Sequence, residues 1–143
     1  MKVKEILTAK GSKVWSVAQK ETIENAVRVL VDQKIGALLV YDESEKVAGI
    51  VTERDIMRAL HKYGKAVTET PVHKIMTERV IIGTPEDDLD YIMGIMTLNR
   101  CRHIPILENG ALQGIVSIGD VVKAQLHDSQ VELKYLKDYM NGR

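Results

Sequence analysis

One seven-residue pattern occurs twice in this chain and constrains its fold more than any other feature. The sequence reads GIVTERD at 49–55 and GIVSIGD at 114–120, about 65 residues later. Before each copy, apolar residues recur at the three- and four-residue spacing of an amphipathic helix, at 23–31 and at 89–96. The chain is therefore an internal repeat whose two halves are expected to share one fold.

Each half reads as strand, helix, strand, strand, helix. The first helix is followed by an apolar run, at 37–41 or 103–107, and a polar turn then leads into a second apolar run. That second run ends at a hydroxyl residue, Thr52 or Ser117, where the next helix begins. The pattern predicts an α+β fold in which a β-hairpin stands between two helices in each half.

The repeat also sets the expected division of the chain. Small domains bury too little surface to be comfortable alone, so the two halves are expected to pack into one integrated unit. We predict repeat 1 over 1–66, repeat 2 over 67–127 and a C-terminal helix over 128–143.

A long helical segment is expected after Asp120. Apolar residues continue to Met140 in alternating steps of four and three, the spacing of an a/d stripe. The stripe consists of Val122, Leu126, Leu133, Leu136 and Met140, with Ser129 at the remaining position. Two interpretations remain open: the helix docks on its own domain, or it packs against a partner chain.

Composition and charge argue against several classes of protein. The 143 residues include 20 Lys and Arg and 20 Asp and Glu, so a formal net charge of zero gives no bulk positive field to attract nucleic acid. The single cysteine, Cys101, allows no internal disulfide, and the first residues contain no apolar targeting or membrane-spanning segment. We therefore predict a cytoplasmic protein without membrane insertion, for which nucleic acid is not an expected partner.

The sequence offers no catalytic or metal-binding pattern. Its four histidines show no zinc-ligand spacing with cysteine or carboxylates, and no phosphate-binding loop or nucleophile motif is present. The arginines on either side of Cys101 would lower its thiol pKa and make it reactive if it were exposed, but the preferred interpretation is a buried, inert thiol. The prediction is a protein that is not an enzyme and holds no metal.

A hydroxyl and a carboxylate stand three residues apart where a strand passes into a helix in each half. These pairs are Thr52 with Asp55 and Ser117 with Asp120. The spacing fits a helix capping box, in which each side chain bonds the backbone amide of the other residue. It also fits a nucleotide site, because a helix N-terminus favours phosphate and a carboxylate accepts hydrogen bonds from ribose hydroxyls. Both interpretations remain open.

Taken together and in this order, the motifs of the chain resemble the cystathionine-β-synthase (CBS) domain, which normally occurs as a tandem pair called a Bateman module. The resemblance covers nearly the whole chain and rests on the segments 14–17, 35–40, 49–55, 72–77, 102–106 and 114–120. In detail the chain is similar to short stand-alone bacterial CBS-pair proteins. These share a Lys-Gly near the start, a Glu-Arg-Asp in the first copy and a Ser-Ile-Gly-Asp in the second.

The resemblance implies two β-α-β-β-α repeats related by a pseudo-two-fold axis, with two clefts for adenosine nucleotides between them. In each cleft, one half would contact the ribose, and mostly the other half would contact the adenine. One cleft would use Ser117, Gly119 and Asp120, with Lys10, Lys13, Trp15, Ile35, Gly36 and Ala37 around the base. The other would use Thr52 and Asp55, with Arg54 beside them and Met76, Arg79, Ile81, Arg102 and His103 nearby.

Several of these residues have an ordinary structural role as their alternative. Arg102 contacts phosphate or forms a surface ion pair. His103 contacts phosphate in its protonated form or is a satisfied strand residue. Trp15 lies against the adenine or packs in the core, and its neighbour Lys13 is expected to be solvated.

The resemblance therefore implies a regulatory module that binds AMP, ADP, ATP or NAD and acts in signal transduction. Its output would be a changed contact within a homodimer or with an unknown regulated protein. The alternative from another class is a structural adaptor with degenerate clefts, in which Asp55 and Asp120 act only as helix caps.

Overall fold

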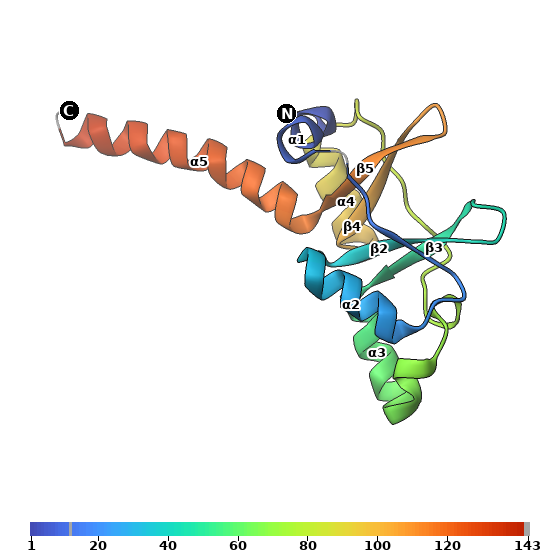
Figure 1. Cartoon of the computed structure of the whole chain (residues 1–143). Coiled ribbons are helices and arrows are strands. Elements are labelled where there is room, and N and C mark those ends of the chain that lie inside the picture. The colour runs from blue at the N-terminus through green and yellow to red at the C-terminus, as the bar shows by residue number, and fades with distance from the viewer. Residues whose placement is uncertain (12, 142–143) are drawn as a thin grey trace. The chain divides into compact units, whose positions relative to one another are not determined.

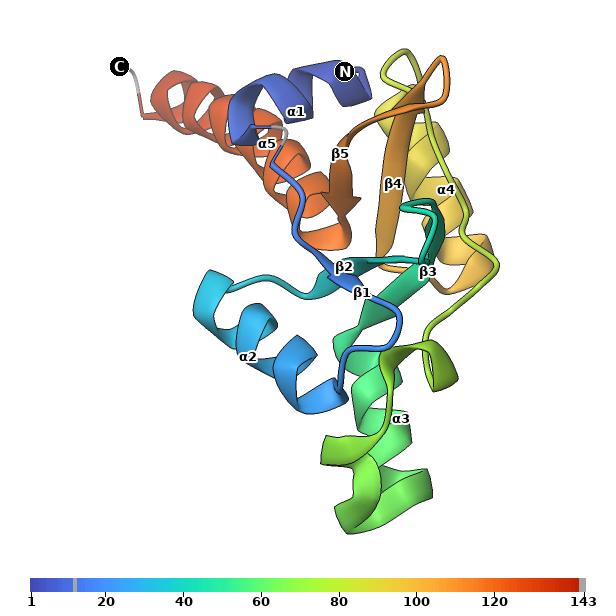
Figure 2. The same ribbon diagram turned by 45° about the vertical axis from the view of Figure 1, so that its right-hand side comes forward.

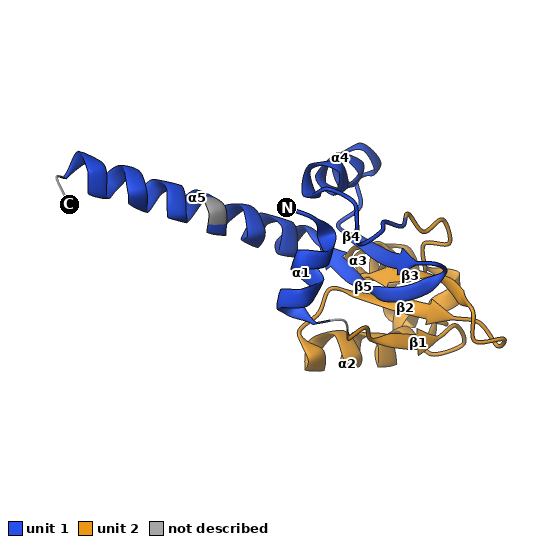
Figure 3. Ribbon diagram, turned by 90° about the horizontal axis from the view of Figure 1, so that it is seen from above, with its two compact units in different colours: residues 1–12, 82–143 blue, residues 13–81 orange. Residues whose placement is uncertain are grey.

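The computed structural model describes residues 1–11 and 13–141, with the backbone alone at position 128. The chain divides into two compact units (Figure 3). Unit 2 consists of residues 13–81, and unit 1 consists of residues 1–12 together with 82–143. Each unit contains one copy of the seven-residue pattern, so each is described by itself.

Unit 2 contains a three-stranded sheet and two α-helices (Figure 1). Strand β1 pairs in parallel with β2, and β2 pairs antiparallel with β3 as a hairpin. The elements are β1 (Ser16–Ala18), α2 (Ile23–Gln33), β2 (Ala37–Tyr41), β3 (Val47–Thr52) and α3 (Glu53–Tyr63), followed by 3₁₀ turns at Gly64–Glu69 and Val72–Lys74. This order confirms the predicted β-α-β-β-α repeat.

Local chemistry and burial explain these elements. Helix α2 begins after Thr22, whose side chain accepts a hydrogen bond from the backbone amide of Asn25. Its apolar face, which includes Ala26 and Leu30, is buried in one cluster with the strand residue Leu38. Strand β2 is almost entirely buried, as its continuous apolar sequence predicts.

Unit 1 repeats the hairpin between two helices. Its elements are α1 (Val3–Lys10), α4 (Leu89–Asn99), β4 (His103–Glu108), β5 (Ala111–Ser117) and α5 (Ile118–Met140). In place of a first strand, this copy has a single parallel bridge between Gly83 and Ile106. Gly83 bonds through its amide and its carbonyl to Pro105 and Leu107, both at 2.9 Å. The second copy therefore keeps the order of the first with a much shorter opening strand.

Helix α1 belongs to unit 1 although it lies at the start of the sequence. Val3 and Ile6 are buried in the same cluster as Ile92 and Ile104 of the second repeat. The backbone amide of Val3 also donates to the carbonyl of Asp87 at 3.0 Å. The repeat boundaries predicted from the sequence, 1–66, 67–127 and 128–143, follow the periodicity and stay a prediction, whereas compactness groups α1 with the second repeat.

Helix α5 is one continuous helix, as the apolar spacing predicts. Its first turns pack against unit 1 and bury Val121. Figures 1 and 2 show the remainder extending past α1 and β5 of the same unit. Along this extension the leucines are open to solvent, with Leu126 53% and Leu133 61% exposed. Docking on its own domain therefore accounts only for the start of α5. The last two predicted positions, 142 and 143, lie outside the described residues.

In the part of the chain that the structure describes, no helix is both long enough and apolar enough to cross a lipid bilayer.

Candidate functional site

The N-terminal turn of α5 holds the hydroxyl and carboxylate of the second copy. Ser117 ends β5, and its Oγ accepts a hydrogen bond from the Asp120 amide at 3.1 Å. Asp120 Oδ2 accepts in return from the Ser117 amide at 2.8 Å. The pair is a complete capping box, so the capping interpretation is confirmed for this copy.

Lys10 brings a cation to the same carboxylate. Its Nζ donates to Asp120 Oδ2 at 2.7 Å and to the Ile115 carbonyl oxygen at 2.7 Å. Among the residues that the structure describes, every hydrogen bond to the Asp120 carboxylate ends on Oδ2. Oδ1 is therefore available as an acceptor at the edge of the site. The predicted place of Lys10 beside a base stays a prediction.

Asp120 is ionised at neutral pH. Burial raises the pKa of this carboxyl, but the hydrogen bond from Lys10, the hydrogen bonds with Ser117 and the charge of Lys10 outweigh burial. The pKa consequently lies below its ordinary value of 3.8. An ionised carboxylate with one open oxygen accepts hydrogen bonds from hydroxyl groups.

His103 contributes a buried nitrogen without a partner. It begins β4 and stands opposite Ser117 in the strand register. Among the described residues, its Nδ1 is buried and makes no hydrogen bond. Burial lowers the pKa of His103, although the nearby Asp120 carboxylate opposes the shift.

A neutral imidazole is therefore expected at pH 7, which disfavours the protonated phosphate contact. The alternative of a satisfied strand residue is wrong in this structure, because Nδ1 has no partner in the described part of the chain.

A pocket of about 280 Å³ lies beside this carboxylate, between α1 and α5. It combines apolar side chains with basic and acidic ones, so it suits a partly apolar ligand that carries both hydrogen-bond donors and acceptors. Its lining residues are Met1, Glu5, Ile6, Ala9, Lys10, Asp120, Lys123, Ala124 and His127. Our sequence interpretation missed Lys123 and His127, although their spacing from Asp120, three and seven residues, places all three on one helix face.

The corresponding carboxylate of unit 2 is enclosed by its own chain. Asp55 Oδ2 accepts from the Thr52 amide at 2.9 Å, and Oδ1 accepts from the Thr77 hydroxyl at 3.3 Å. The Asp55 amide donates to Thr52 Oγ1 at 3.3 Å, which completes a second capping box. Both carboxylate oxygens of Asp55 are therefore already bonded within unit 2, and only 9% of the residue is exposed.

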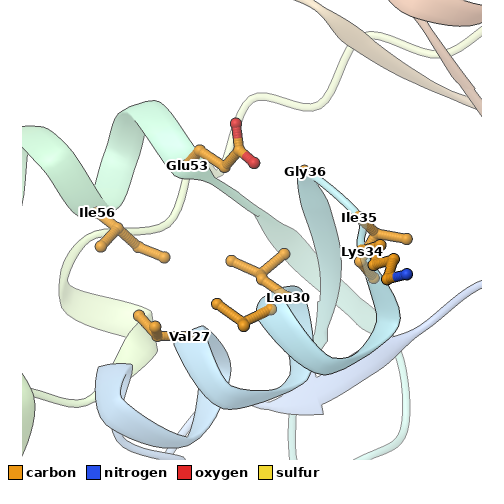
Figure 4. Close-up of a pocket in the computed structure, with 8 residues that line it drawn as sticks. Val27, Leu30, Lys34, Ile35, Gly36, Glu53 and Ile56 are labelled. Carbon is orange, nitrogen blue, oxygen red and sulfur yellow. The ribbon is translucent and has the colours of Figure 1, made fainter.

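The other residues predicted for the base are spread over unit 2. Ala37 is buried, while Ile35 and Gly36 line a separate pocket of about 440 Å³ between α2 and α3 (Figure 4). Glu53 of α3 and Lys34 at the end of α2 also line this pocket.

The Lys13 and Trp15 side chains are in contact with each other. Lys13 is exposed, as expected, and its Nζ lies 4.3 Å from the centre of the Trp15 ring, which is a cation–π contact. Trp15 also packs against the buried cluster of unit 2, as the core interpretation expects.

The remaining predicted residues differ in exposure. Met76 packs against the core of unit 2, and Ile81 is partly buried. Arg54, Arg79, Arg102 and Gly119 are exposed. Within unit 1 the structure thus brings Lys10, His103, Ser117 and Asp120 to one place, and within unit 2 it brings Thr52 and Asp55 together beside Thr77.

Cys101 does not have the reactive character that its arginine neighbours suggest. The side chain packs partly against the core of unit 1. Burial raises the pKa of its thiol. The preferred interpretation of a buried, inert thiol is therefore confirmed, and the reactive alternative is wrong.

Comparison with known proteins agrees with this arrangement. A model of the CBS domain matches residues 3–62 and again 72–127. The chain belongs to the CBS domain family. The double match and the two copies of the fold make it a tandem CBS pair, as the motifs predict.

Individual relatives show how far this likeness extends. The chain is 40% identical, over 94% of its length and 67% of the relative's, to the CBS domain-containing protein CBSX3, mitochondrial, of Arabidopsis thaliana. Because that relative is described as mitochondrial, the cytoplasmic location stays a prediction.

Two solved structures share the fold. The CBS-domain protein ATU1752 of Agrobacterium tumefaciens superposes with a TM-score of 0.84 at 43% identity, covering 87% of this chain and 92% of its own. That relative is thus a CBS pair with little beyond it. The CBS pair of protein MJ0100, solved with 5-methylthioadenosine and S-adenosyl-L-methionine, superposes at 0.78 with 24% identity, covering 90% of this chain and 98% of its own.

Proposed function

We propose that this CBS pair is a regulatory module that binds an adenosine nucleotide at the start of α5 in unit 1. The observation that carries the proposal is the ionised Asp120 carboxylate, whose Oδ1 is open beside a pocket with basic side chains. The vicinal hydroxyls of a ribose would donate to this carboxylate. The lone Nδ1 of His103 would accept or share a further hydrogen bond, directly or through water.

Lys10 would change partners when the nucleotide binds. In the free protein it neutralises Asp120 at 2.7 Å. A lysine ammonium on a flexible stem can reach a phosphate nearby while leaving the carboxylate to the ribose. Lys123 lines the same pocket and would offer its ammonium group to a phosphate, while Glu5 of the same lining would oppose an anion near α1.

Adenosine ligands are the class favoured for this site. AMP, ADP, ATP and NAD all carry the ribose that the carboxylate would recognise, and so do the two ligands bound by the MJ0100 pair. The predicted adenine contacts of Lys13, Trp15, Ile35, Gly36 and Ala37 belong to this proposal as untested contacts. Met76, Arg79, Ile81 and Arg102 stay predicted contacts of the other cleft, with Thr52 and Asp55.

Regulation would follow from the position of the site. Asp120 lies in the first turn of α5, so a ligand bonded there acts on the helix that extends from unit 1. A ligand shifts a conformational equilibrium only by its differential affinity for the two states. The output would be a contact within a homodimer or with a regulated protein, without any catalytic step.

One observation favours a second candidate, a structural adaptor. Both capping boxes are complete without a ligand, and Asp55 is fully bonded within unit 2. An adaptor would use both carboxylates for helix stability alone, and it would bind no nucleotide.

A thermal-shift panel separates the two candidates. The purified protein is heated with AMP, ADP, ATP, NAD, S-adenosylmethionine and, as a base control, GTP. A ligand at a hundred times its Kd stabilises the folded state by about 2.7 kcal/mol, which raises the melting temperature measurably. We expect at least one adenosine compound to raise it and GTP to leave it unchanged. A flat response to the whole panel would contradict the proposal and favour the adaptor.

A further inference from the structure

The extended part of α5 presents an apolar stripe that unit 1 leaves uncovered. Val122, Leu126, Leu133 and Leu136 are all among the exposed large apolar side chains, as is Met140. An isolated helix gains little from exposed leucines, since its stability comes mainly from packing an apolar face. Such a face in a continuous helix indicates that another surface covers it.

The stripe follows the heptad repeat of a coiled coil. Leu126, Leu133 and Met140 occupy successive a positions, seven residues apart. Val122, Ser129 and Leu136 occupy the d positions between them. Leucine and methionine at these positions supply the knobs of knobs-into-holes packing, while the serine weakens the seam at one layer.

The residues beside the stripe select both the partner and the orientation. Glu132 stands at a g position on one side of the stripe, and Lys137 stands at the following e position on the other side. In a parallel pair, each g residue faces the next e residue of the other helix. Two copies of α5 would therefore place Glu132 of each copy against Lys137 of the other, twice by symmetry.

The next flanking pair is equally compatible with a second copy. Gln125 at g would face Gln130 at e, which places two neutral amides together. In an antiparallel pair, g faces g and e faces e, so no register pairs Glu132 with Lys137. The charges thus complement each other only when two copies run in the same direction.

We propose that α5 of two copies of this chain forms a parallel two-stranded coiled coil over residues 122–140. The proposal stands without the proposed function, because it depends only on the exposed stripe and its flanking charges. Fewer than three full heptads, with one polar layer, give a weak, reversible pair rather than a permanent one.

Cysteine pairing tests the alignment directly in the full chain. In a Cys101→Ala background, Ser129→Cys places a thiol at a d position, where the two copies of a parallel coil face each other. Val131→Cys is the matched control, because position 131 lies on the opposite side of the helix and is 61% exposed. We expect mild oxidation to convert the Ser129→Cys protein to a disulfide-linked dimer at least about tenfold faster than the control. Equal rates, or no linked dimer, would overturn the proposal.

Charge exchange tests the orientation independently. Glu132→Lys and Lys137→Glu each place like charges together in a parallel coil, and the double exchange restores opposite charges. By analytical ultracentrifugation at low salt, each single variant should raise the dimer Kd severalfold, and the double variant should return it to near the wild-type value. A protein that stays monomeric at all concentrations, or a double variant no better than the singles, would contradict a parallel pair of copies. Circular dichroism checks that all variants keep the helix content of the wild type.

Discussion

Asp55 and Asp120 occupy the same position in their repeats, yet the hydrogen bonds around them leave different atoms available. Thr77 bonds the second oxygen of Asp55, whereas the corresponding oxygen of Asp120 stays open. Among the described residues, Lys10 forms an ion pair with Asp120, and Asp55 has no such cation. Both oxygens of Asp55 are therefore used within the chain, whereas Oδ1 of Asp120 can still accept a hydrogen bond from a ribose hydroxyl.

His103 predicts a dependence of stability on pH. Its pKa is lowered in the folded protein because the ring is buried, while the unfolded chain binds a proton near the ordinary value of 6.5. Just below that pH the unfolded state binds more protons, so the free energy of unfolding falls as the pH is lowered from about 6.5 towards the folded pKa. We expect His103→Asn to show a shallower fall than the wild type in urea unfolding between pH 7 and pH 5.

The control for this experiment is His61→Asn, since His61 is an exposed residue of α3. This variant removes an imidazole without changing the surroundings of His103. Equal slopes for the His103→Asn variant and the wild type would show that His103 does not take part in this proton linkage.

Some residues of the candidate site could be predicted from the sequence alone. Ser117 and Asp120 were found because a hydroxyl and a carboxylate three residues apart at a strand-to-helix passage have few other uses. The resemblance placed Lys10 in the same cleft as Asp120, but the direct contact between the two could not be predicted, because it depends on α1 packing against the second repeat. The sequence also left a lowered pKa at Cys101 as an alternative, because two neighbouring charges are visible in a sequence and burial is not.

At the scale of elements, a close backbone approach in unit 2 explains how Thr77 reaches Asp55. Ile50 of β3 exchanges two backbone hydrogen bonds with Thr77, at 3.0 and 2.8 Å. Gly49 permits the approach, since a Cβ at that position would lie 2.6 Å from the Thr77 carbonyl oxygen. The segment around Met76 therefore lies directly against the hairpin, and its Sδ would lie 2.9 Å from such a Cβ.

Gly49→Ala is expected to destabilise the protein. The added methyl group meets backbone rather than a flexible side chain, so the free energy of unfolding should fall by about 1–3 kcal/mol. Gly94→Ala in α4 is the matched control, because nothing lies within 4 Å of a Cβ there. In that helix, alanine should raise the free energy of unfolding by about 0.5–1 kcal/mol. Denaturant unfolding measures both, and an unchanged Gly49→Ala protein would contradict the close approach.

The elements themselves were largely predictable. Periodic apolar residues located α2 and α4, and hydroxyl caps located the starts of α3 and α5. The opening strand of the second copy was not predictable in its length. It is reduced to one bridge at Gly83, where a Cβ would approach the Ile92 and Ile106 side chains at 2.9 and 3.1 Å.

At the scale of the whole molecule, the sequence repeat and the compact units divide the chain differently. The second sequence repeat begins near the middle of the chain, whereas unit 1 also contains the first twelve residues of the chain. The repeated pattern does not show which unit α1 joins, because the residues of α1 are not part of that pattern. The family and its two CBS repeats were nevertheless recognisable, since six motifs occur in a fixed order.

A calorimetric titration tests the central claim, nucleotide binding at Asp120, most directly. The adenosine compound with the largest thermal shift is titrated into the wild type, Asp120→Asn and Asp55→Asn. The two variants are matched, because each removes one carboxylate from one capping box. We predict that Asp120→Asn weakens binding about tenfold or more, the loss of a hydrogen bond to a charged group, and that Asp55→Asn stays close to the wild type. Binding that survives Asp120→Asn and is lost in Asp55→Asn would contradict the account.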